Sequence, residues 1–347
     1  TSTSEPPSCT CDLQIKAVTV TEGRHYFKIV FTASILYPVF VFLLLWYAAI
    51  LLSNLLLIAV ISQSRSLHEP MFVFMCALFV NEVYGSTAIF PMLLSQILHE
   101  AHVITRAACL LQIFCLYSYG GTEFSLLTLM SYDRYLAICR PLQYSSSMTP
   151  TKMAALITLC WSYNLIVNLF ITYGLTGRLK PCGNVIDKVY CDNYLMVKLS
   201  CSDAMVSKIF GSVHFVCYVL GLVGLILYSY ARILRVCLRS SKRARQTALG
   251  TCVPHLLSFL NFSFGGLFEV MQSRFNMSAV STPLRVFLSL HWLTVQPLAS
   301  PVIYGLKMTK IRNTMGFNPS IVLTSPMIYG LKMTKIRQMV RDLLCWK

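Results

Sequence analysis

Long runs of apolar residues alternate with short polar connections along most of the chain. Each run contains about 20 or more mostly apolar residues, the length that an α-helix needs to cross a bilayer. The pattern therefore predicts an all-α fold, a bundle of seven transmembrane helices. The runs cover about residues 30–64, 71–94, 105–139, 152–176, 204–238, 247–271 and 284–306.

Composition favours a membrane protein over a soluble enzyme. Of the 347 residues, 56% are hydrophobic and 12% are charged, which is about half the charged share of a soluble domain. The formal net charge is +16, but the basic residues cluster in short connections. That clustering is typical of membrane topology and of contact with anionic lipid, and it argues against nucleic-acid binding. No spacing of cysteines and histidines matches a zinc site.

The positions of Lys and Arg predict the orientation in the membrane. The connection 232–246 and the tail after the last apolar run are strongly basic, whereas 95–104 contains no Lys or Arg. The positive-inside rule then places 232–246 and the C-terminus in the cytoplasm, and seven spans place the N-terminus outside. The connection 177–202 is also basic, but its three cysteines favour the oxidising outer side.

We therefore expect three regions: an extracellular tail over 1–27, a seven-helix domain over 28–312 and a cytoplasmic tail over 313–347. The tail contains a nearly identical copy of 301–312 at 326–337, with Met327 in place of Val302. The first copy should end the seventh helix, because 315–331 is short and twice broken by proline. The second copy is then an interfacial tail or an artefact of the gene model.

Two carboxylates lie where hydrocarbon is expected, Glu82 in the second run and Glu123 in the third. A carboxylate at membrane depth costs on the order of 2.5–3.5 kcal/mol and usually faces a bundle interior or a wet cavity. The third run ends on Asp133-Arg134-Tyr135. A breakable Asp133–Arg134 ion pair suits a two-state element, although Arg134 snorkelling at an interface is an alternative. These features predict a bundle that switches between two states.

Five stretches, in this order and spacing over about residues 30–312, resemble vertebrate odorant receptors of the rhodopsin-like class, most of all those of fish. The resemblance implies a G-protein-coupled receptor of the plasma membrane, in the cilia of olfactory sensory neurons. It would bind a small organic odorant and activate a heterotrimeric G protein of the olfactory stimulatory type, which raises cyclic AMP. The stretches are Leu67–Phe72, Met130–Cys139, Ser229-Tyr230 with Ile233-Leu234, Thr251-Cys252 with His255-Leu256, and Pro301–Tyr304.

The resemblance also assigns residues to activation. Arg134 would leave Asp133 and help to receive the C-terminal helix of the G protein, with Tyr230 and Tyr304 as its partners in the active state. The full set for coupling is Asp133, Arg134, Tyr135, Tyr230, His255 and Tyr304.

Glu82 and Glu123 match family positions that face each other at mid-membrane. Two anions there repel, so one should be protonated or a sodium ion should bridge them. A shared proton that affects only packing is the alternative, and no other cofactor is expected. Ser300 stands where the family has Asn before Pro-x-x-Tyr, which weakens the expectation of an ion site and of signalling.

By resemblance, Cys109 pairs with Cys191 and Cys182 with Cys201, and the bridges hold the long outer loop as a lid; spacing alone leaves several pairings open. Under that lid, helices three, five, six and seven would form the odorant pocket, although half of the matched residues could serve helix packing alone. The pocket residues are Leu116, Tyr117, Gly120, Gly121, His214, Tyr218, Phe262, Ser263, Val270 and Arg274.

The charge of the odorant follows from two further observations. Residues 107–122, the outer half of the third helix, contain no acid that could pair with an amine. Arg274 lies where some family members carry a carboxylate-binding Arg, and its planar fork matches a carboxylate. We therefore hypothesise an acidic or zwitterionic odorant, with a solvated loop Arg as the alternative.

Three other functions stay open. The same fold could bind a non-odorant ligand, such as a metabolite in another tissue. A transporter could relay protons through Glu82 and Glu123, but it should show inverted repeats. A non-signalling product of a degenerate gene is favoured by Ser300 and the repeated tail.

Overall fold

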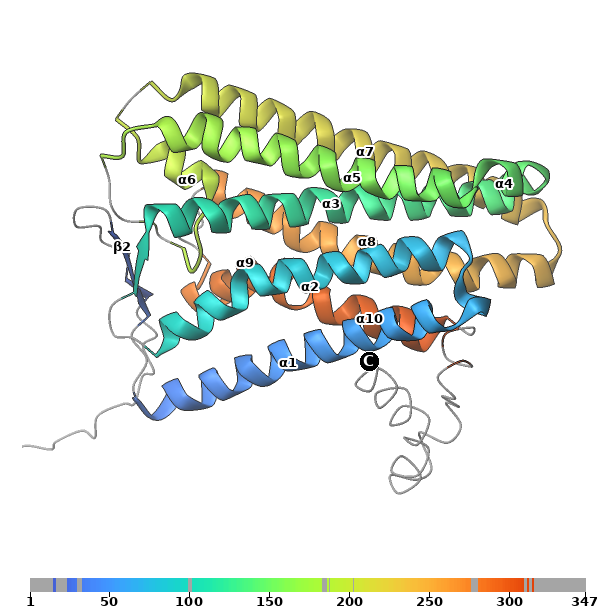
Figure 1. The fold of residues 1–347 in the computed structure, drawn as a ribbon, viewed down its shortest axis with the longest axis horizontal. Helices are drawn as coiled ribbons and strands as arrows, with labels where there is room; N and C mark the ends of the chain where they lie inside the picture. The colour runs from blue at the N-terminus through green and yellow to red at the C-terminus, as the bar shows by residue number, and fades with distance from the viewer. Residues whose placement is uncertain are drawn as a thin grey trace, which may run out of the picture.

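The computed structural model describes residues 15–16, 24–29, 33–98, 102–182, 186, 188–201, 203–275, 280–308, 311 and 314. Most of them form long helices that run side by side (Figure 1). Two short helices, α4 (Pro141–Ser147) and α6 (Asn193–Lys198), lie in connections at opposite ends of the bundle. The long helices are α1 (Ala33–Gln63), α2 (Pro70–Ile97), α3 (Arg106–Cys139), α5 (Pro150–Leu169), α7 (Met205–Arg239) and α8 (Lys242–Arg274), followed by α9 (Thr282–Thr294) and α10 (Gln296–Lys307).

These helices confirm the all-α bundle, and their bounds lie within a few residues of the seven predicted runs. The helices α1, α2, α7 and α8, and α5 with its continuation to Arg178, are each long and apolar enough to cross a membrane. The pair α9 and α10, bent by 52° at a short break, forms a sixth such span. The helix α3 is long enough to cross a membrane but is less apolar than these spans, because its glycines, hydroxyls and charged side chains lower its hydropathy.

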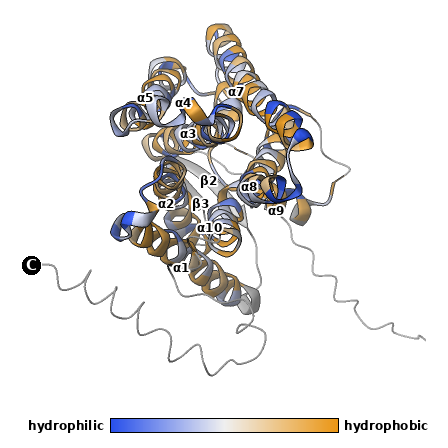
Figure 2. Cartoon of the chain, turned by 90° about the vertical axis from the view of Figure 1, so that its right-hand side faces the viewer, coloured by the Kyte–Doolittle hydropathy of each residue, from blue (hydrophilic) through white to orange (hydrophobic). Residues whose placement is uncertain are grey.

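The central helix is α3, which packs against α2, α5, α7 and α8. Figure 2 looks along the helices and shows α3 between α2, α5 and α7. Tyr119 and Met130 of α3 are fully buried, whereas Leu52 of α1 and Leu220 of α7 are more than half exposed on the outside. Apolar outer faces are stable in lipid, so the polar residues turn toward the interior.

The break between α9 and α10 follows from proline chemistry. Pro297, at the start of α10, has no N–H to donate to the carbonyl of Leu293, and Pro301, inside α10, has none to donate to the carbonyl of Pro297. Asn54 Nδ2 of α1 donates to that carbonyl instead, at 2.7 Å. At the break itself, Trp46 Nε1 donates to Thr294 O at 2.9 Å. Two α1 side chains thus satisfy backbone groups that the bend leaves open.

A small antiparallel sheet, which the helical pattern did not predict, lies at the end of the bundle that carries α6. Its strands are β1 (Ile15–Lys16), β2 (Arg24–Ile29) and β3 (His102–Thr105), in the order β1-β2-β3. The β2–β3 register pairs Arg24 with Thr105. The repeated segment 326–337 lies outside the described residues.

Candidate functional site

A partly open hollow lies at the end of the bundle that carries α6, the end predicted to face outward, and we call it the outer hollow. Its walls come from α3, α6, α7 and α8, so segments far apart in the sequence form it. Tyr117, Val270 and Arg274, three of the predicted pocket residues, line it. The other lining residues are Asp192, Asn193, Tyr194, Val197, Ser207, Lys208, Gly211, Ser212, Phe215, Glu269 and Ser273.

One wall of this outer hollow carries positive charge. The Arg274 guanidinium lies over the ring of Tyr194, 4.3 Å from its centroid, and donates to Ser212 Oγ at 3.0 Å. Lys208 of α7 lines the same space. Within the described part of the chain neither cation forms an ion pair, and both residues are exposed. A ligand carboxylate could therefore bind both.

The lining of the outer hollow also contains two carboxylates of a buried ion cluster. Lys188 Nζ lies 3.1 Å from Asp192 Oδ2 and also contacts Glu269 Oε1. Burial alone would lower the pKa of the Lys188 ammonium, but the Asp192 and Glu269 carboxylates outweigh burial and raise this pKa above its ordinary value. The lysine therefore stays charged, and the cluster joins the outer loop to α8.

The other predicted pocket residues lie beside the outer hollow and do not line it. Leu116 is buried in the core. Gly120 faces Trp292, and Phe262 packs edge-on against Phe124 with ring centroids 4.9 Å apart. Ser263 Oγ is buried without a hydrogen-bond partner. This part of the bundle is packed with aromatic side chains.

Three further predicted residues lie between α3, α5 and α7. Gly121 faces Asn164 of α5. Tyr218 Oη lies 2.6 Å from Ser125 Oγ and accepts from Asn164 Nδ2 at 3.0 Å. His214 Nε2 lies 3.1 Å from Tyr163 Oη of α5. These contacts join helices and are directed away from the outer hollow.

Glu82 and Glu123 are fully buried at the centre of a polar network. Glu82 accepts hydrogen bonds from Tyr119 Oη at 2.8 Å and Ser300 Oγ at 3.0 Å. Glu123 accepts from Asn81 Nδ2 at 2.9 Å and from the Nε2 of Gln296 at 3.1 Å. Since Gln296 Nε2 also donates to Ser300 Oγ at 2.9 Å, the network joins α2, α3 and α10.

The oxygens around the two carboxylates fit a small hard cation, which prefers oxygen ligands. Among the described residues, no three His, Cys, Asp or Glu side chains gather in a group that could hold a metal ion. However, Asn81 Oδ1 is buried without a hydrogen-bond partner, Asn81 Nδ2 donates to Glu123, and the Ser300 hydroxyl contacts Glu82. The site thus offers carboxylate, amide and hydroxyl oxygens.

At the other end of the bundle, Arg134 is held by its neighbour. Arg134 Nε donates to Asp133 Oδ2 at 2.8 Å, and Tyr144 Oη of α4 donates to Asp133 Oδ1 at 2.8 Å. Tyr135 is buried, with Arg140 over its ring at 5.8 Å. The ion pair is thus closed and anchored to the following connection.

The predicted activation partners of Arg134 have other contacts. Tyr230 Oη lies 2.6 Å from His255 Nδ1, and His255 Nε2 lies 2.8 Å from the carbonyl of Leu127. Because a carbonyl can only accept, Nε2 carries a proton, and in the neutral ring Nδ1 then accepts from Tyr230. Tyr304 is fully buried, with its ring against Phe79. This arrangement connects α3, α7 and α8.

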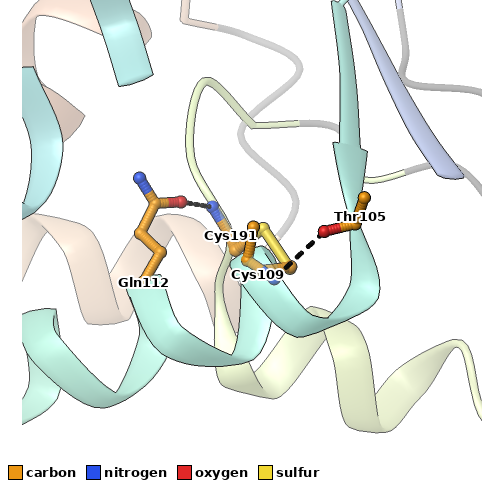
Figure 3. Close-up of a disulfide and its surroundings, with 5 residues drawn as sticks. Thr105, Cys109, Gln112 and Cys191 are labelled. Carbon is orange, nitrogen blue, oxygen red and sulfur yellow. Dashed lines mark hydrogen bonds between the residues drawn. A yellow bond between two sulfur atoms is a disulfide. The ribbon is translucent and has the colours of Figure 1, made fainter. Parts of the chain in front are cut away.

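Two disulfides join the pairs that the resemblance implies, Cys109–Cys191 and Cys182–Cys201. Figure 3 shows the first bridge at the start of α3, where Thr105 caps the helix. Gln112 Oε1 accepts from Cys191 N at 2.9 Å, beside the bridge. The outer loop is therefore fixed to α3 by a covalent bond and a hydrogen bond.

Three residues of the ion cluster were not singled out from the sequence: Lys188, Asp192 and Glu269. A signal existed for Glu269, because it is an acid inside the apolar run 247–271, as Glu82 is inside its own. For Lys188 and Asp192 the available signal was weak, since charged residues are common in polar loops.

Comparisons with known proteins agree with this architecture. A family model described as "Olfactory receptor" matches residues 42–318. The human protein Olfactory receptor 11A1 is 36% identical over 300 residues, covering 85% of this chain and 89% of that protein. The mouse protein Olfactory receptor 8U3 is 33% identical, covering 80% and 86%. In fold, the chain resembles squid rhodopsin with a TM-score of 0.64 at 17% identity, covering 86% of this chain and 82% of that one.

Proposed function

The chain belongs to the olfactory receptor family, and from this premise we propose that it binds a small organic odorant in the outer hollow and activates a stimulatory olfactory G protein, raising cyclic AMP. As a family member it is a multi-pass membrane receptor and not an enzyme. The main support is the separation of two sites: the outer hollow lies at one end of the bundle, and the Asp133–Arg134 pair lies at the other. Binding at one end can favour an open state at the other.

The polar network supplies a connection between these ends. It links Glu82 and Glu123 to Ser300 and Gln296 beside the bent α9–α10 break. A small shift of α8 or α10 would exchange hydrogen bonds there, which suits a two-state element. Ser300 stands where the family has Asn, and in this proposal it takes over that position by donating to Glu82 and accepting from Gln296.

A cyclic-AMP reporter assay in cells that express the full chain tests this function. We expect a dose-dependent response to members of an odorant panel, and we expect Arg134→Ala to abolish it. An N-terminal tag stained on intact cells measures the amount of receptor at the plasma membrane and tests whether the N-terminus lies outside. The same staining in olfactory sensory neurons tests the proposed location in their cilia. An unchanged response in Arg134→Ala, or a tag reached only after permeabilisation, would contradict the proposal.

We further propose that the odorant carries a carboxylate that binds Arg274. A charge-assisted hydrogen bond contributes about 1.5–3 kcal/mol, so Arg274→Ala should raise the half-maximal concentration of carboxylic odorants by roughly 10- to 100-fold. Arg274→Lys should recover part of this loss, because it keeps the charge without the planar fork. Responses to uncharged odorants provide the control. Equal potency of carboxylic odorants on wild type and Arg274→Ala would rule out this contact.

A sodium ion at Glu82 and Glu123 is the last element of the proposal. It would bridge two carboxylates that otherwise share a proton, in place of that proton. Thermal unfolding of the purified receptor should then occur at higher temperature in sodium chloride than in choline chloride. Glu123→Gln should remove this difference. Identical melting of wild type in the two salts would favour the shared proton.

A further inference from the structure

Lys188 is a buried cation that the chain supplies to two carboxylates of the outer hollow. Its side chain is 3% exposed, against 5% for Asp192 and 10% for Glu269. It also donates to Ser273 Oγ at 2.7 Å. Asp192, Glu269 and Ser273 all line the hollow, so the groups that hold the ammonium also face the ligand space.

Neither carboxylate has another cation among the described residues. Asp192 accepts from Leu195 N at 2.9 Å, as the cap of α6, and from Tyr117 Oη at 3.4 Å. Glu269 Oε2 accepts from Ser289 Oγ at 2.7 Å. All these donors are neutral, and buried carboxylates without a cation are strongly unfavourable. Two negative charges therefore depend on the single ammonium of Lys188.

This arrangement has the composition of an ammonium-binding site: two carboxylates and a hydroxyl around one –NH₃⁺. We propose that Lys188 fills this site as a tethered cation and so determines the charge of the ligand. The wild-type hollow then excludes ligands with an ammonium group, and a receptor without the Lys188 side chain accepts them. The inference rests on the proposed function in that it takes the outer hollow as the ligand site.

The proposal narrows the expected ligand. An ammonium entering the hollow would meet Lys188 where its carboxylate partners are, and Lys208 and Arg274 elsewhere in the lining. A zwitterion would thus lack a free partner for its positive end. An anionic odorant with its carboxylate at Arg274 fits the charges of the lining. A neutral odorant fits them as well.

Chemical rescue of Lys188→Ala tests this site directly. The probe is n-propylammonium chloride, which replaces the lost ammonium, and 1-propanol is the uncharged control of similar size. Lys188→Ala should lower the unfolding temperature of the purified full-length receptor. Propylammonium should raise that temperature in Lys188→Ala, increasing with concentration as for any ligand of the folded state. Potassium chloride at equal ionic strength, with the sodium concentration held constant in every sample, separates specific binding from screening.

Wild type and a double variant are the matched controls for Lys188→Ala. Wild type should not respond to propylammonium, because Lys188 fills the site, and the double variant Lys188→Ala/Glu269→Gln should respond much less, because one carboxylate is gone. Equal shifts in all three proteins, or an equal shift with 1-propanol, would overturn the proposal. No shift in folded Lys188→Ala would also overturn it.

A second measurement covers a variant that does not survive purification. Surface staining of tagged Lys188→Ala in intact cells, grown with and without propylammonium, reports folding without isolation. Recovery with the amine and not with 1-propanol supports the site, and equal staining in both media contradicts it. Unfolding and staining do not depend on signalling. A receptor that gives no signal but is still rescued would therefore contradict the proposed function and leave the ammonium site at Asp192 and Glu269 supported.

Discussion

Replacing Cys109 and Cys191 together by serine should remove most folded receptor from the cell surface. Their bridge closes a loop of 82 residues and fixes the outer loop to α3. Loss of a native disulfide typically costs 2–5 kcal/mol, a large share of the roughly 5–15 kcal/mol that stabilises a folded domain. The outer loop contains Lys188 and Asp192, so this part of the lining of the outer hollow should be lost with it.

The bridge between Cys182 and Cys201 provides the matched control. It closes 19 residues, and the chain-entropy relation makes the longer loop worth about 1.3 kcal/mol more. Backbone hydrogen bonds also hold this shorter loop, from Cys182 N to Leu199 O at 2.9 Å and from Cys201 N to Lys180 O at 3.1 Å. Cys182→Ser/Cys201→Ser should therefore keep more surface receptor. Equal surface staining and unfolding temperatures for the two double variants would contradict this ranking.

The helices could be predicted from the sequence because their signal is local. A run of about 20 apolar residues is sufficient to indicate a span, and the run 204–238 became α7 over Met205–Arg239. The break between α9 and α10 was not predicted within the run 284–306. Its geometry depends on Trp46 and Asn54 of α1, which lie more than 240 positions away in sequence.

The residues that line the outer hollow were harder to predict from the sequence than the helices. Position along a helix indicates depth in the membrane, but the direction of a side chain depends on how the helix is rotated against its neighbours. Tyr117 faces the outer hollow, whereas Gly121, four residues later, faces α5. The outer half of α3 has no acid and so predicted no partner for an amine, whereas both carboxylates of the ion cluster come from α8 and the outer loop.

Gly121→Ala should be the most damaging single-methyl change in α3. The added Cβ would overlap the side-chain amide of Asn164, whose Cγ would lie at 2.9 Å. Asn164 cannot swing away freely, because it is buried and donates to Cys160 O at 2.8 Å and Ser125 Oγ at 3.1 Å. Overpacking costs about 1–3 kcal/mol, and each hydrogen bond broken in the interior adds about 1–3 kcal/mol. This exceeds the roughly 0.5–1 kcal/mol that Ala gains over Gly in a helix.

Gly224→Ala in α7 is the control, because a Cβ there meets no atom within 4 Å and the position is exposed. It should match wild type in unfolding temperature or exceed it slightly. The double variant Gly121→Ala/Asn164→Ala should recover part of the loss, since the second change makes room for the first. The experiment also separates two roles for Gly121: a residue that only lines the odorant pocket would change odorant selectivity on substitution and leave the unfolding temperature unchanged.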